Sequence, residues 1–155
     1  MLLKTLQYLF KRDLEKLKTE IISYQQEENI WIVDKNISNC AGNLCLHLVG
    51  NLNTYLGTHL GNTGYVRQRD LEFSLKNVPR ATLINQIEDT ITVIENTLSQ
   101  LTEADLEKEY PIIVFKNKME TGLFLMHLAT HLTYHLGQIN YHRRLLDNTD
   151  KVIHS

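Results

Sequence analysis

Four of the seven histidines in this 155-residue chain fall in one short stretch, LFLMHLATHLTYHLGQINYHRR. His127, His131 and His135 follow one another at intervals of four, so in a helix they share one face, with neighbours about 6 Å apart along the axis. Two adjacent imidazoles at this spacing can ligate one metal ion, whereas the outer two, about 12 Å apart, cannot do so in a straight helix. The spacing therefore predicts one adjacent ligating pair, without deciding which, and requires a further ligand from elsewhere.

A second polar group stands in an otherwise apolar segment, CAGNLCLHLVGNLNTYLG. Asn43 and Asn51 flank His47 at steps of four residues, and in a helix these side chains form one polar stripe. A polar stripe that faces a core without partners is unfavourable. We therefore expect it to face a metal ion and its water shell, at a site between facing helices.

Three neutral imidazoles would leave coordination positions open for water or substrate, as in catalytic rather than structural zinc sites. Imidazole suits zinc, nickel, copper or iron, and such an ion would lower the pKa of a bound water or thiol or polarise a substrate oxygen. The alternative is that these histidines are surface or hydrogen-bonded core residues, because HxxxH also recurs by chance. The sequence contains no HExxH, GxSxG, phosphate loop or dinucleotide fingerprint.

Other residues offer weaker signals. Arg67 and Arg69, in the charged stretch RQRDLEF, can clamp a substrate carboxylate, such as one on a thiol cofactor; the alternative is a crossover loop held by surface ion pairs. Tyr55 and Tyr134 are candidate proton donors, or packing residues.

We expect the remaining histidines and the cysteines to be structural. His59 and His142 are predicted to lie at helix ends or in solvent, and His154 in a frayed tail. Cys40 and Cys45 would lie about 140° apart around a helix, which is too divergent for a disulfide, so we expect small, reduced core residues.

The composition limits the class of protein. Only 2 prolines and 7 glycines argue against an all-β protein with many tight turns. Sixteen Lys and Arg residues against 18 Asp and Glu residues give a net charge of -2, which argues against nucleic-acid binding. No run of about 18 apolar residues occurs, so no membrane partner is expected. Residues 1–155 are predicted to form a single cytoplasmic domain.

The spacing of apolar residues predicts four long amphipathic helices, hence an all-α, four-helix bundle. The first is expected over 2–28, and the second from a cap at Ser38 or Asn39 to about Gly61. The third is expected from Pro79 to about Leu101, and the fourth from a cap at Thr121 to about Leu146. Between them we expect a loop with short extended pieces at 29–37, a crossover loop at 65–77, a short helix opened by Thr102 and Asp105 and ended by Pro111, and one short strand at 112–115.

The segment LCLHLVGNL on the second long helix and the segment HLTYHLGQI on the fourth resemble the DinB/YfiT-like superfamily. Together with the number and order of the helices, the resemblance covers essentially the whole chain. The resemblance implies an up-down-down-up bundle whose long second crossover corresponds to 62–78. It also implies a divalent metal held by His47, His131 and His135, with zinc or nickel expected before iron or manganese. His127 would then lie beside the ligands or at a dimer contact.

The resemblance further implies a homodimer and a metal-dependent enzyme. Characterised relatives include thiol-dependent S-transferases and a thiol-dependent isomerase, so the expected activity is that of a transferase or hydrolase that activates a small thiol or water towards an electrophile. The alternatives are a non-catalytic, metal-stabilised binding or stress-response module and a scaffold without metal. Gln138 is expected to hydrogen-bond near the site, and Gly137 to permit close approach of a neighbouring helix.

Overall fold

The computed structural model describes residues 1–147, and within that range it contains helices and no β-strand. The all-α class predicted from the sequence is therefore confirmed. The helical segments are α1 (Leu2–Ser23), η1 (Glu27–Trp31), α2 (Ala41–Leu52), η2 (Asn53–Thr58), α3 (Arg69–Ser74), α4 (Arg80–Ser99), α5 (Glu103–Glu107) and α6 (Thr121–Leu146). His154, which the sequence places in a frayed tail, lies outside the described residues.

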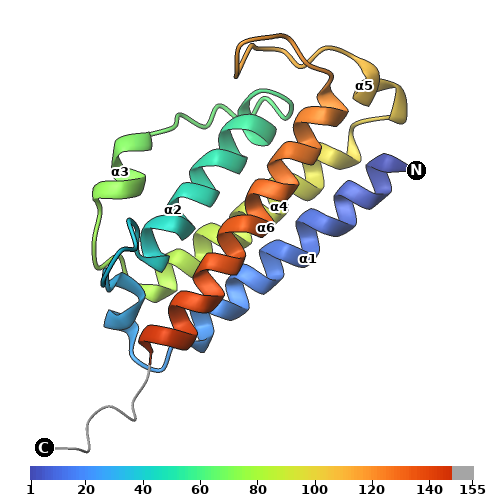
Figure 1. The fold of residues 1–155 in the computed structure, drawn as a ribbon. Coiled ribbons are helices and arrows are strands. Elements are labelled where there is room, and N and C mark those ends of the chain that lie inside the picture. Colours follow the sequence, from blue (N-terminus) through green and yellow to red (C-terminus); the bar gives the residue numbers. More distant parts are fainter. Residues whose placement is uncertain (148–155) are drawn as a thin grey trace, which may run out of the picture.

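The helices α1, α2, α4 and α6 lie side by side (Figure 1). Both α1 and α2 pack against α4 and α6, so α1 and α2 occupy opposite corners of the group. The chain descends the view of Figure 1 along α1 and α6 and ascends it along α2 and α4. This arrangement brings α2 against α6, the two helices that carry the predicted histidines.

Burial follows the apolar patterning. On α1 the buried positions recur at steps of three and four, among them Leu6, Phe10, Leu14 and Leu17. Helix α2 differs because all of its residues, Ala41–Leu52, are buried. The reason is visible in Figure 1, where α3 and its flanking chain cover the side of α2 that the other long helices leave free.

Several helix ends differ from the predictions. Helix α1 ends at Ser23 rather than near residue 28, because the carboxylate of Asp147, at the end of α6, accepts hydrogen bonds from the backbone N–H groups of Gln25 and Gln26. Cys40, not Ser38 or Asn39, caps α2, with its Sγ accepting from a backbone N–H one turn on.

The predicted capping box of α5 is present, with Thr102 and Asp105 bonded reciprocally. Pro79 and Glu120 immediately precede α4 and α6, so Thr121 is the first helical residue and not the cap.

Two predicted loop features are wrong. The 65–77 stretch contains the helix α3, which the periodicity missed because its buried residue is the charged Glu72. Residues 112–115 form no strand; their surroundings provide only an isolated β-bridge between Glu109 and Glu120 in the described chain.

His142 lies near the end of α6, one of the two predicted positions, but it is buried and not solvated. Its Nδ1 lies 2.7 Å from the hydroxyl of Tyr24 and its Nε2 lies 2.8 Å from the carbonyl oxygen of Ile32. The imidazole therefore fastens the end of α1 and the chain after η1 to α6. Cys40 and Cys45 are free and buried, as predicted.

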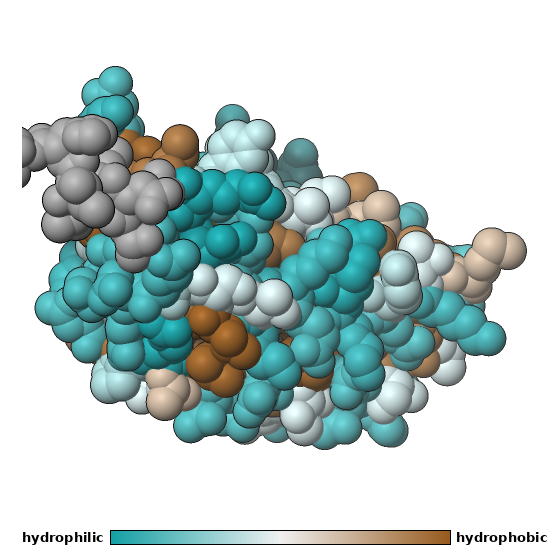
Figure 2. Space-filling view, turned by 90° about the horizontal axis from the view of Figure 1, so that it is seen from below, coloured by the Kyte–Doolittle hydropathy of each residue, from teal (hydrophilic) through white to brown (hydrophobic). Residues whose placement is uncertain are grey.

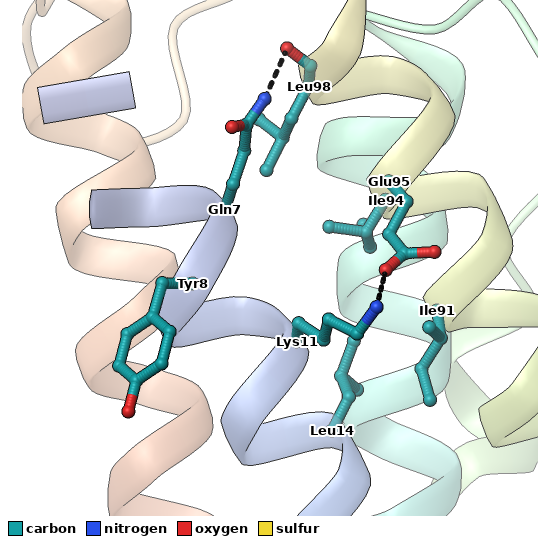
Figure 3. Close-up of a pocket in the computed structure, with 8 residues that line it drawn as sticks. All are labelled: Gln7, Tyr8, Lys11, Leu14, Ile91, Ile94, Glu95 and Leu98. Carbon is teal, nitrogen blue, oxygen red and sulfur yellow. Dashed lines mark hydrogen bonds and ion pairs between the residues drawn. The ribbon is translucent and has the colours of Figure 1, made fainter. Parts of the chain in front are cut away.

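The face in Figure 2 is mainly hydrophilic, with small separate hydrophobic patches. A hollow of about 290 Å³ between α1 and α4 is spanned by an ion pair of 2.7 Å between Lys11 and Glu95 and by a hydrogen bond from Gln7 to the carbonyl of Leu98 (Figure 3). Its lining has no histidine or cysteine, so it is not a candidate for metal chemistry.

Candidate metal centre

Three imidazoles converge between α2 and α6. The Nε2 atom of His131 lies 3.2 Å from that of His47 and 3.1 Å from that of His135. Ligand atoms of all three lie within 4.8 Å of one another, and within residues 1–147 no other three His, Cys, Asp or Glu side chains converge in this way. Zinc–nitrogen bonds of about 2.0–2.1 Å in a tetrahedron place nitrogens about 3.3 Å apart. The three residues can therefore hold a metal ion.

The orientation of His47 is set by a buried carboxylate. Its Nδ1 lies 3.1 Å from Oε1 of Glu72, while Nε and Nη2 of Arg67 donate to the same carboxylate at 2.8 and 2.9 Å. Burial alone would raise the pKa of Glu72, but the hydrogen bonds from His47 and Arg67 outweigh it and the pKa is lowered. An ionised carboxylate only accepts, so the proton of His47 is on Nδ1 and its Nε2 presents a lone pair to the other histidines.

The orientation of His135 is also set by a hydrogen-bond acceptor at its Nδ1. Its Nδ1 lies 2.7 Å from Oε1 of Gln138, an acceptor, so Nδ1 carries the proton and Nε2 presents a lone pair. The Nε2 of His131 can donate a proton to only one of these two lone pairs, and its own Nδ1 is buried without a partner in the described chain. Hydrogen bonds therefore cannot satisfy the cluster, whereas a cation at the shared point would accept all three lone pairs. The donor set fits a divalent transition metal.

Burial favours the neutral form of His131 and His135, the form that metal ligation requires. Burial, followed by the proximity of His135 and His47, lowers the pKa of His131 to about 4. The pKa of His135 is also lowered, first by burial, although its hydrogen bond with Gln138 acts in the opposite direction. Near neutral pH a metal ion would therefore meet little competition from protons at these two residues.

A hollow of about 270 Å³ opens beside the histidines, and we call it the histidine hollow. None of the acidic residues within 1–147 lines it. It is formed by His47, Asn51, Tyr55, Arg67, Arg69, Val114, Phe115, Phe124, His127, Leu128 and His131. A larger groove of about 1180 Å³ lies on the other side of His135, between residues 34–39 and the outer face of α6.

The polar stripe on α2 is divided between two roles. Asn43 does not face the histidines, contrary to the prediction; its Nδ2 donates to the carbonyl oxygens of Glu72 and Leu75, each at 2.8 Å, and so anchors α3. Asn51 lines the histidine hollow, where its buried Oδ1 has no partner in the described chain.

The remaining predicted residues surround the three imidazoles. His127 also lines the histidine hollow, with its ring 5.0 Å from that of Phe115. Tyr134 is 66% exposed, with its ring 5.4 Å from that of His135, so it can reach solvent and the site. Gln138 hydrogen-bonds at the site as predicted, but Gly137 meets no neighbouring helix, because nothing lies within 4 Å of the position of its added Cβ.

The two arginines of the crossover segment have different environments. Arg67 is paired with Glu72 in a largely buried ion pair, so the prediction of surface ion pairs is wrong for this residue. Arg69 lies over the ring of Phe73 at 5.5 Å and forms no ion pair within residues 1–147.

Sequence reasoning missed Glu72. The signals were an arginine five residues earlier and Gly50 on α2, where an added Cβ would overlap the Glu72 carboxylate. Neither signal identifies Glu72 as the partner of His47 unless α3 is known to lie against α2.

Fold and site together define an all-helical protein with a three-histidine cluster that can hold a metal ion. Residues 2–154 match the family described as "Protein of unknown function (DUF1572)", and the chain belongs to this family. No curated protein matches the sequence. Among residues 1–147, none of the helices combines the length and apolar character needed to cross a membrane.

Proposed function

We propose that this protein binds a divalent transition metal ion through His47, His131 and His135. The observation that carries the proposal is the convergence of their Nε2 atoms, with lone pairs directed at one point by Glu72 and Gln138. Zinc or nickel is expected first, with iron or manganese as further candidates.

Membership of the DUF1572 family, which is grouped with the DinB/YfiT-like superfamily, supports this proposal. We also infer the up-down-down-up four-helix bundle of that superfamily, since α1 and α6 run opposite to α2 and α4 and a long crossover joins α2 to α4. A single domain, a homodimer and a cytoplasmic location stay predictions from the sequence.

The activity we propose is that of a metal-dependent transferase or hydrolase. A bound divalent ion would act as a Lewis acid that lowers the pKa of a small thiol or water near it. The chain itself supplies three neutral donors, leaves the histidine hollow for an electrophile, and places Tyr55 on its wall as a candidate proton donor.

A second candidate is a non-catalytic binding or stress-response module. The observation that favours it is that the ligands come from two different helices, so an ion would cross-link α2 to α6 and stabilise the fold without turnover.

The test is metal content together with activity on the same samples. Wild-type protein reconstituted with zinc or nickel should hold about one ion per chain, His131→Ala should lose it, and His127→Ala, a matched change one turn away, should retain it. Loss of a thiol in the presence of an alkylating electrophile, dependent on the ion, would support the transferase. Metal binding without thiol transfer or hydrolysis would favour the module, and equal metal content in wild type and His131→Ala would end the proposal.

A further inference from the structure

The electrostatic character of the histidine hollow is uneven. Arg67 is neutralised by Glu72, with two hydrogen bonds between guanidinium and carboxylate. Arg69, on the same wall, forms no ion pair or hydrogen bond within residues 1–147, and no acidic residue lines the hollow. A bound divalent ion would add further positive charge, so the hollow favours an anion.

A second observation on the same wall points to a ligand. Asn51 is only 7% exposed, it lines the hollow, and its Oδ1 has no hydrogen-bond partner in the described chain. Leaving a buried amide oxygen without a hydrogen-bond donor costs folding free energy. A hydrogen-bond donor on a molecule in the hollow would offset that cost, whereas no side chain among residues 1–147 does so.

The apolar part of the lining limits the shape of the molecule. Phe115, Phe124 and Leu128 supply apolar surface in the same lining as the arginines and imidazoles. The volume of about 270 Å³ lies below the range of about 300–1,000 Å³ typical of pockets for drug-sized ligands. The occupant is therefore small, with both polar and apolar parts.

We infer that the histidine hollow binds a small carboxylate-bearing molecule, with the carboxylate on Arg69 and the opposite, reacting end towards the three imidazoles. The placement of the reacting end rests on the proposed function, whereas the carboxylate contact with Arg69 does not. Guanidinium pairs with carboxylate through two parallel N–H···O bonds, which gives the contact direction as well as charge.

The test compares two probes of similar size and shape, 3-mercaptopropionate, which carries a negative charge, and 3-mercaptopropionamide, which is neutral at that end. Amide chemical-shift titrations of ¹⁵N-labelled full-length protein, metal-free and zinc-loaded, measure both affinities and locate the binding surface. We expect the carboxylate to bind about five- to tenfold more tightly, as for a charge-assisted hydrogen bond, with shifts centred on α3 and Asn51. Arg69→Gln should remove this preference, while Arg144→Gln, the same change at an exposed position on α6, should retain it.

The outcomes separate this inference from the proposed function. If zinc fails to bind but the carboxylate preference depends on Arg69, the metal proposal fails and the carboxylate contact stands. If zinc binds and both probes bind wild type equally, or Arg69→Gln keeps the preference, the contact with Phe73 is the whole role of Arg69 and the inference is wrong. A thermal melt of Arg69→Gln equal to that of wild type shows that its fold is intact.

Discussion

At the scale of single residues, the site is governed by which atom carries each proton. Glu72 and Gln138 each accept from an Nδ1, and this turns the Nε2 lone pairs of His47 and His135 towards His131. Such partners of metal-binding histidines typically affect metal affinity by about 10–100-fold. We therefore expect Glu72 to contribute to metal affinity through the imidazole that it orients.

Replacing Glu72 with Gln should lower zinc affinity about tenfold or more, because the charge that fixes His47 and balances Arg67 is removed. Isothermal titration with zinc measures the effect. Glu88→Gln, the same change at an exposed position on α4, is the control and should bind like wild type. Equal affinities for the two variants would show that Glu72 does not orient His47.

At the scale of elements, helix packing places each group of the site. Helix α3 lies against α2, and Gly50 leaves the space that the Glu72 carboxylate fills. Helix α6 is tied to α1 by a hydrogen bond of 2.6 Å from Thr133 to the buried Asp13, in the same turn as His131 and His135. Small changes in packing at either contact should therefore alter the positions of the three histidines.

Gly50→Ala and Gly137→Ala form a matched pair of helical substitutions. Alanine favours a helix over glycine by about 1 kcal/mol, so Gly137→Ala, with open space around it, should raise the melting temperature and leave zinc affinity unchanged. Gly50→Ala should displace Glu72 from His47 and lower zinc affinity about tenfold. Thermal melts and zinc titrations of both variants decide this, and an unchanged affinity for Gly50→Ala would contradict it.

The Asp13 contact predicts a pH dependence of stability. Burial would raise the pKa of Asp13, but hydrogen bonds from Arg12 and Thr133 lower it below its ordinary value of 3.8. A carboxylate with a lowered folded-state pKa stabilises the fold above its unfolded-state pKa, and this stability is lost as the pH falls through the folded-state value.

Asp13→Asn should therefore be less stable than wild type at pH 7, by about 1–3 kcal/mol. The difference should begin to shrink below about pH 4, where this aspartate takes up a proton in the unfolded chain, and should be lost as the pH falls through the lower folded-state pKa of Asp13. Denaturant unfolding at several pH values measures it, with Asp89→Asn, an exposed change on α4, as the control. A difference that does not vary with pH would refute the assignment.

At the scale of the whole molecule, the candidate ligands connect helices that are distant in the sequence. His47 and His131 are separated by 84 positions, yet their Nε2 atoms lie 3.2 Å apart. An ion held by both would stabilise the folded state alone, because the unfolded chain does not hold these groups together.

Zinc at about 100 times its dissociation constant should add about 2.7 kcal/mol to the free energy of unfolding. For a chain of this size that corresponds to a rise of about 5–10 °C in melting temperature, reversed by a chelator. His47→Ala should lose the rise and His59→Ala should keep it, measured by differential scanning calorimetry. A similar rise in His47→Ala would mean that zinc binds elsewhere.

Local patterns in the sequence were enough to predict the four long helices and to select the histidines of α2 and α6 as candidate ligands. The apolar residues at steps of three and four predicted which face of α1 is buried, and the spacing of the α6 histidines placed them on one face. Both follow from side-chain periodicity, which depends only on the helix itself. The length of α1 was overestimated, since its end depends on Asp147, which lies on a distant part of the chain.

Packing between helices determined the rest. Spacing alone left the choice of histidine pair open, and the position of α2 brings His47 to His131 and His135 while His127 packs against Phe115. The roles of Glu72 and Arg67 depend on α3 lying over α2. Hydrophobic periodicity shows which face of a helix is buried, but it contains no information about which buried polar groups from different helices will meet.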